Sequence, residues 1–148
     1  MLLSLAGTEA FDRKTRKSHD RMVKRAHDLA LAHTIELDYR DKNLTVVDDL
    51  LCSIAKELHD SGVVTSRQII NNRTAREVTE CLGHYLVECI ERNHTAGLWR
   101  ETDPDGELTS CFQLLDDNSV VFPMEWVMEK LLDPKHYSVD EAYAQYVG

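Results

Sequence analysis

The residues best placed to do chemistry lie in the middle of the chain, where His84 is one helical turn from Glu80 and Glu88 and three residues from Cys81. On a helix, side chains three and four residues apart share a face. Imidazole, carboxylate and thiol groups all bind metals, but a metal site requires three or four converging ligands. No HExxH-type pair is present, and a lone histidine beside an apolar face is more often a hydrogen-bonded packing residue. The sequence therefore predicts no metal site here.

A second group of carboxylates, Glu101-x-Asp103-x-Asp105-Gly106, follows the first half of the calcium-loop pattern D-x-[DN]-x-[DN]-G. The pattern fails at its first position, which is Glu, and at its twelfth, where Phe112 replaces the glutamate that would bind the ion through both oxygens. Asp-Pro-Asp-Gly is also a strong turn signal. A hairpin therefore explains these residues without an ion.

Motifs for other chemistries are missing from the sequence. It has no G-x-S-x-G, no glycine-rich phosphate loop and no CxxC pair, and its four cysteines stand singly. Free cysteine is among the most buried residue types, so we expect reduced thiols in the core. The sequence favours a non-enzymatic protein, with no catalytic residue and no cofactor.

The element on which the rest is expected to pack is a helix over 74–93. Its apolar residues recur at the spacing of one helix face: Ala75, Val78, Leu82, Tyr85, Leu86, Cys89 and Ile90. Charged residues fill most of the opposite side. This is the pattern of a helix that faces a core.

Hydrophobic periodicity and turn signals predict the other elements. Before the central helix we expect one long helix or two over 8–39, an amphipathic helix from Thr45 to a stop at Ser61-Gly62, and a short helix opened by Thr65 or Ser66. After it we expect strands over 97–101, 107–115 and 119–122, a helix opened by Pro123 and a short helix begun by Ser138.

These elements predict an α+β fold. The chain has 148 residues, of which 43% are hydrophobic, which suits one ordinary core. We expect a single domain over 1–148, with a helical N-terminal part at 1–62. That part packs with the central helix on a three-stranded antiparallel sheet, and short C-terminal helices complete the part at 74–148.

An aromatic side chain on the sheet is a candidate binding residue. Regular alternation places Trp99, Cys111 and Val121 on the face opposite Phe112 and Val120. Two interpretations stay open: either a helical segment covers this face, or it forms a binding surface around Trp99, because exposed aromatic patches on small proteins mark partner sites.

The charge is acidic and unevenly spread. The formal net charge is −9, although residues 1–40 hold eight basic and six acidic residues. Seven of the basic residues lie between Arg13 and Arg25, which indicates either a solvated helix face or a contact for nucleic acid or an acidic partner. Without interleaved aromatic residues or a helix-turn-helix pattern, and with an acidic remainder, nucleic-acid binding is the less favoured alternative.

The sequence contains no signal for a membrane. No apolar run approaches the roughly 20 residues that span a bilayer. The opening MLLSLAG lacks the basic and long apolar regions of a signal peptide. We expect a cytoplasmic protein.

Three stretches of the C-terminal half follow a shared pattern. The residues 82–88, LGHYLVE, fit a helix beginning LGxxLxE. Gly97-Leu98-Trp99 has the glycine and tryptophan of a GxxW strand, with one residue between them in place of two. Residues 122–131 follow the pattern of an FPxxxVxKxL helix, with the lysine one position later. Over about 78–145 the chain resembles a family of small bacterial domains of unknown function. The resemblance implies the fold of this half and no activity.

Together these features favour a bacterial protein-interaction domain, such as an immunity or inhibitor protein, that binds a protein partner through an acidic and aromatic surface. One alternative is a small-molecule sensor or enzyme with a pocket between the central helix and the sheet, lined by His84, Glu88 or Trp99. Another is a nucleic-acid-associated regulator that uses the basic first helix, and a homo-oligomer is left open. The candidate partner-binding residues are Trp99, Val121, Asp103, Asp105, Arg13, Arg21 and Arg25.

Overall fold

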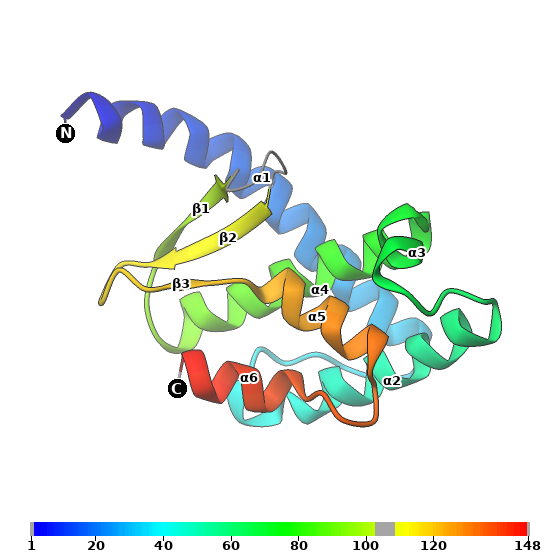
Figure 1. Ribbon diagram of the computed structural model, residues 1–148. Coiled ribbons are helices and arrows are strands. Elements are labelled where there is room, and N and C mark those ends of the chain that lie inside the picture. Colours follow the sequence, from blue (N-terminus) through cyan, green and yellow to red (C-terminus); the bar gives the residue numbers. More distant parts are fainter. Residues whose placement is uncertain (1, 103–108, 148) are drawn as a thin grey trace.

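The computed structural model describes the backbone of residues 2–102 and 109–147 and the side chains of 16–99 and 111–147. Helices and a small antiparallel sheet make up this part of the chain, which confirms the α+β prediction (Figure 1). The elements are α1 (Leu2–Ala32), the 3-10 helix η1 (Asp41–Asn43), α2 (Thr45–Asp60), α3 (Ser66–Asn71), α4 (Arg73–Asn93), β1 (Gly97–Thr102), β2 (Thr109–Leu114), β3 (Val120–Val121), α5 (Pro123–Leu132) and α6 (Val139–Tyr146).

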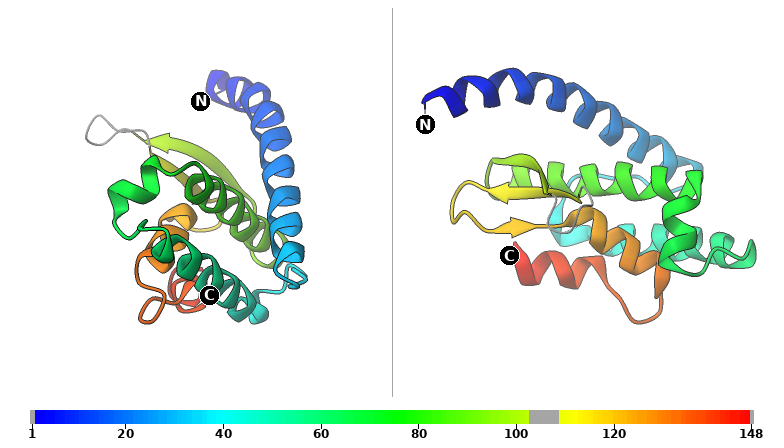
Figure 2. Two further views of the ribbon diagram at one scale, coloured as in Figure 1. Left: turned by 90° about the vertical axis from the view of Figure 1, so that its right-hand side faces the viewer. Right: turned by 45° about the horizontal axis from the view of Figure 1, so that its top comes forward.

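The central helix α4 is buried on more than one side. The side chain of Asn72 caps it by accepting a hydrogen bond from the N–H of Ala75. The predicted stripe is buried, and Cys81, Gly83 and Val87 are buried with it. The reason is that α1 and α5 pack on different sides of α4 (Figure 2), so one stripe does not account for all of its contacts.

The first helix ends earlier than predicted. It stops at Ala32, and Thr34 and Tyr39 take positive φ angles of 60° and 65°. A positive φ just after a helix, here at Thr34, is typical of a C-terminal cap, although glycine is the usual residue there. The chain then runs without regular structure to η1, and the N–H of Tyr39 donates to the hydroxyl oxygen of Tyr85 on α4.

The sheet is a meander in the order β1-β2-β3, and its register corrects the predicted faces. Trp99 pairs with Phe112, and Phe112 pairs with Val121. Directly paired residues share a face, so Trp99 and Val121 lie beside Phe112 rather than opposite it. Cys111 and Val120 lie on the other face, where Cys111 is buried and Val120 is exposed. The prediction was wrong because a one-residue error in register moves a strand's side chains to the opposite face.

The C-terminal helices are tied to the N-terminal part by the carboxylate of Asp48 on α2. It accepts hydrogen bonds from the Ser138 hydroxyl and from the N–H groups of Val139 and Asp140, and it lies 3.9 Å from the buried ammonium of Lys130. Residues of both predicted parts thus join one hydrophobic core. Within the described residues, no helix has both the length and the apolar character needed to cross a membrane.

Candidate functional site

An open groove lies between β3, α5 and α6. Its volume is about 320 Å³, which is at the lower end of the range for ligand pockets. The lining residues are four aromatic side chains, two carboxylates and two valines: Phe122, Trp126, Tyr137, Tyr146, Glu125, Glu129, Val120 and Val121. Apolar walls with a few charged groups are typical of a binding site.

Local sequence signals position the aromatic walls. Pro123 occupies the start of α5, where its missing N–H and fixed φ are tolerated. The Ser138 side chain caps α6 by accepting from the N–H of Glu141. The two helices bring the rings of Trp126 and Tyr146 into a stack, with centroids 6.0 Å apart and an interplanar angle of 14°.

The electrostatics of the groove are negative. Glu125 and Glu129 are exposed, and no basic side chain is among the lining residues that the structure describes. Burial and, after it, the nearby carboxylate of Glu129 raise the pKa of Tyr137 to about 12. The groove therefore suits a ligand with apolar and positively charged groups.

The candidate residues predicted on the sheet do not form a surface patch. Val121 is only 3% exposed and contributes to the groove floor. Trp99 is half-buried against the rings of His84 and Phe112, at centroid distances of 4.5 and 6.0 Å. Asp103 and Asp105 lie outside the described residues.

The basic helix has carboxylates beside it. Arg16 makes a bidentate pair with Glu91 of α4, at 3.1 and 3.0 Å. Arg25 lines a hollow of about 240 Å³ that also contains Asp28 and Glu77. Arg21 is exposed, and the side chain of Arg13 is outside the described part. These contacts favour the interpretation of a solvated helix face that lies near acidic side chains of the rest of the protein.

His84, Glu88 and Trp99 do come together, and they meet around a residue that the sequence argument did not select. His19 of α1 places its Nδ1 at 2.9 Å from Nδ1 of His84 and its Nε2 at 3.5 Å from Glu88 Oε1. A usable signal existed, because His19 precedes Val23, Ala26 and Ala30 at helical spacing on the buried face of α1.

The groove residues Trp126 and Tyr146 were likewise not selected. Only the spacing of aromatic residues on two adjacent helices pointed to them. Comparison with known proteins adds no assignment: no protein-family model matches the chain, and no curated protein or solved structure is detectably similar to it.

Proposed function

We propose that this protein is a protein-interaction domain that binds a basic, partly apolar segment of a partner in the groove between β3, α5 and α6. The observation that carries the proposal is the combination of stacked aromatic walls with two exposed carboxylates and no lining cation. An immunity or inhibitor protein would be one example of such a domain.

The chemistry of the walls supports a cationic ligand. The faces of aromatic rings attract ammonium and guanidinium groups within about 6 Å, and the exposed ring of the stack is Tyr146, because Trp126 is only 5% exposed. Tyr146 is 55% exposed and Val120 is 42% exposed, so both offer apolar surface to an incoming segment. With a net charge of −9, the whole molecule attracts a basic partner, and that attraction weakens as salt screens it.

The sequence argument placed the partner-binding surface around Trp99, and the present proposal places it in the groove. A binding surface requires accessible aromatic area, which Tyr146 offers in the groove at 55% exposure, whereas Trp99 is half-buried against His84 of α4. The resemblance to small bacterial domains of unknown function adds no partner to this proposal.

Intrinsic fluorescence tests the proposal, because the chain has two tryptophans. In a Trp99→Phe variant, Trp126 is the sole tryptophan and reports on the groove. We expect its emission to change on titration with short peptides in which lysine or arginine alternates with leucine. Peptides of the same length with glutamate in place of the basic residue should leave it unchanged.

Matched charge variants locate the binding. Glu125→Gln together with Glu129→Gln should weaken the basic peptide by about fivefold or more, since each exposed ion pair contributes up to about 1 kcal/mol. Glu57→Gln with Glu80→Gln removes the same charge from exposed positions on α2 and α4, outside the groove lining, and should change the affinity by less than about twofold. Equal effects of the two pairs, or equal binding of the basic and acidic peptides, would refute the proposal.

A further inference from the structure

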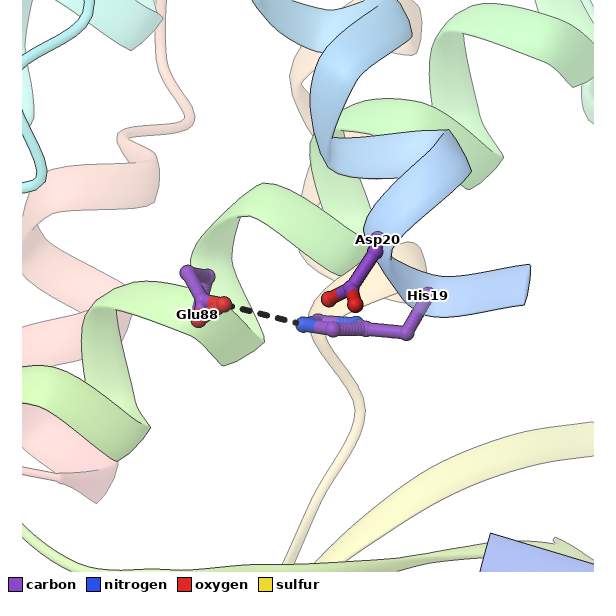
Figure 3. A group of neighbouring side chains, drawn as sticks. All are labelled: His19, Asp20 and Glu88. Carbon is purple, nitrogen blue, oxygen red and sulfur yellow. Dashed lines mark ion pairs between the residues drawn. The ribbon is translucent and has the colours of Figure 1, made fainter. Parts of the chain in front are cut away.

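Three potential ligand atoms converge where α1 crosses α4. His19 and Asp20 come from α1 and Glu88 from α4, and one donor atom of each lies within 4.8 Å of the other two. Figure 3 shows the imidazole of His19 directed at the Glu88 carboxylate, with the Asp20 carboxylate beside the ring. This cluster lies apart from the groove and is independent of the function proposed for it.

The Nε2 atom of His19 has no hydrogen-bond partner among the described residues, although the residue is only 1% exposed. Its distance to Glu88 Oε1 is 3.5 Å, but the pair does not have hydrogen-bond geometry. A buried polar atom of this kind is destabilising when nothing satisfies it. Such an atom, aimed at carboxylates, indicates a missing ligand.

In one of its two tautomers, the histidine pair is compatible with a cation as the missing ligand. Since Nδ1 of His19 and Nδ1 of His84 are 2.9 Å apart, one of them carries the hydrogen and the other accepts it. If His19 donates, its Nε2 presents a lone pair toward two carboxylates, which is unfavourable unless a cation lies between them. Metal-bound histidines commonly donate their other ring N–H to a neighbouring group, and His84 is placed to accept it.

We propose that His19 Nε2 and the carboxylates of Asp20 and Glu88 bind one divalent first-row transition-metal ion such as Zn²⁺. Zinc–ligand distances of about 2.0–2.2 Å place two ligands of one ion roughly 3.2–4.4 Å apart. The donor atoms are within 4.8 Å, so a small rotamer change at exposed Asp20 closes the site. Three protein ligands leave a position for water or a further ligand.

The surrounding charges are compatible with a cation. Arg16 is neutralised by its bidentate pair with Glu91. Arg92 lies 3.7 Å from Glu88 Oε2 and leaves Oε1 free to face His19.

The donor set selects the kind of ion. One imidazole with two carboxylates suits Zn²⁺, Mn²⁺ or Fe²⁺ better than Mg²⁺ or Ca²⁺, which prefer oxygen ligands alone. Cys81 and Cys89 of α4 are buried, and neither is among the side chains that converge on this site.

The test uses the full chain after treatment with a chelator, titrated with Zn²⁺ in a calorimeter and with Co²⁺ in a spectrophotometer. Asp20→Asn and Glu88→Gln remove one ligand charge each without a large change in volume. Asp28→Asn and Glu80→Gln are matched controls at exposed positions of the same two helices. Circular dichroism verifies that each variant is folded.

We expect one equivalent of Zn²⁺ to bind, and each ligand variant to weaken it by about tenfold or more, while the controls stay within about twofold. Co²⁺ should give d–d bands without thiolate charge-transfer absorption. The proposal is overturned if wild-type protein and Glu88→Gln bind Zn²⁺ equally or not at all, or if the cobalt spectrum shows thiolate ligands. A response to Mg²⁺ as strong as that to Zn²⁺ would overturn the ion assignment.

Discussion

Replacement of Asp48 by alanine should destabilise the whole fold, because this carboxylate joins α2 to both C-terminal helices. It accepts three hydrogen bonds at the start of α6, of 3.0, 2.7 and 3.2 Å. Two come from backbone N–H groups at a helix N-terminus, where negative charge is favoured. The fourth neighbour is the ammonium of Lys130, whose residue is 6% exposed.

The magnitude follows from what the substitution leaves behind. Lys130 also donates to the carbonyl oxygens of Pro134 and Tyr137, at 2.6 and 2.7 Å, so its hydrogen bonds survive but its only nearby counter-charge within the described residues is lost. Breaking a buried pair by removing one partner costs about 3–5 kcal/mol. Since a domain of this kind is stable by about 5–15 kcal/mol, Asp48→Ala should lose a large part of its free energy of unfolding.

Chemical denaturation followed by circular dichroism measures this loss. The matched control is Asp49→Ala, the neighbouring exposed residue, which should change the free energy of unfolding by less than about 0.5 kcal/mol. A second arm, Lys130→Met, should cost less in the Asp48→Ala background than alone, because the charge pair is already broken. Equal stability of the Asp48 and Asp49 variants would refute this account of the network.

Three further predictions concern packing and titration. Gly83→Ala should lower the free energy of unfolding by about 1 kcal/mol despite the better helix propensity of alanine, because the added Cβ would lie 2.6 Å from Met124 Cγ and 3.3 Å from its Cα. Thermal unfolding measures this loss, and a variant more stable than wild type would contradict the prediction. Trp99→Ala should lower the free energy of unfolding by about 2 kcal/mol, since Trp99 packs on His84. A loss below about 0.5 kcal/mol would mean that Trp99 behaves as a surface residue without a packing role. Tyr137 should ionise near pH 12, seen as the difference in tyrosinate absorbance between wild type and Tyr137→Phe. The pKa of Tyr137 in the folded protein lies above the value of about 10 for an unfolded chain, so its contribution to stability is complete below pH 10 and is lost as the pH rises to about 12. Ionisation at the ordinary pKa would contradict the burial of this hydroxyl beside the carboxylate of Glu129.

Features that depend on local sequence were predictable. The amphipathic spacing in 74–93 and the turn residues between the strands report local geometry, and the structure confirms the central helix and the meander. The end of α1 was not predictable in this way, because Thr34 and Tyr39 adopt positive φ without the glycine that usually signals it. Hydrogen bonds of the last helical turn surround Thr34, from its N–H to Leu31 O and from the N–H of Ile35 to Ala30 O, whereas the N–H of Tyr39 makes a tertiary hydrogen bond to Tyr85.

Features that depend on how elements pair were missed for a related reason. The face of Trp99 depends on the register between β1 and β2, which alternation within each strand does not determine. Similarly, His84 and Glu88 were rejected as metal ligands because no HExxH-type pair is present and a lone histidine beside an apolar face is more often a packing residue. His19 lies on α1, 65 residues before His84, with Asp20 next to it, and only the packing of α1 on α4 brings them near.

The central helix explains why the two candidate sites stay separate. Gly83 faces α5, where the missing side chain allows Met124 to approach, whereas the next residue, His84, faces His19 of α1. Consecutive residues on a helix point about 100° apart, so α4 supports the groove-bearing helix on one side and the cluster on another. The side chains between them are buried core residues, close-packed and without charge.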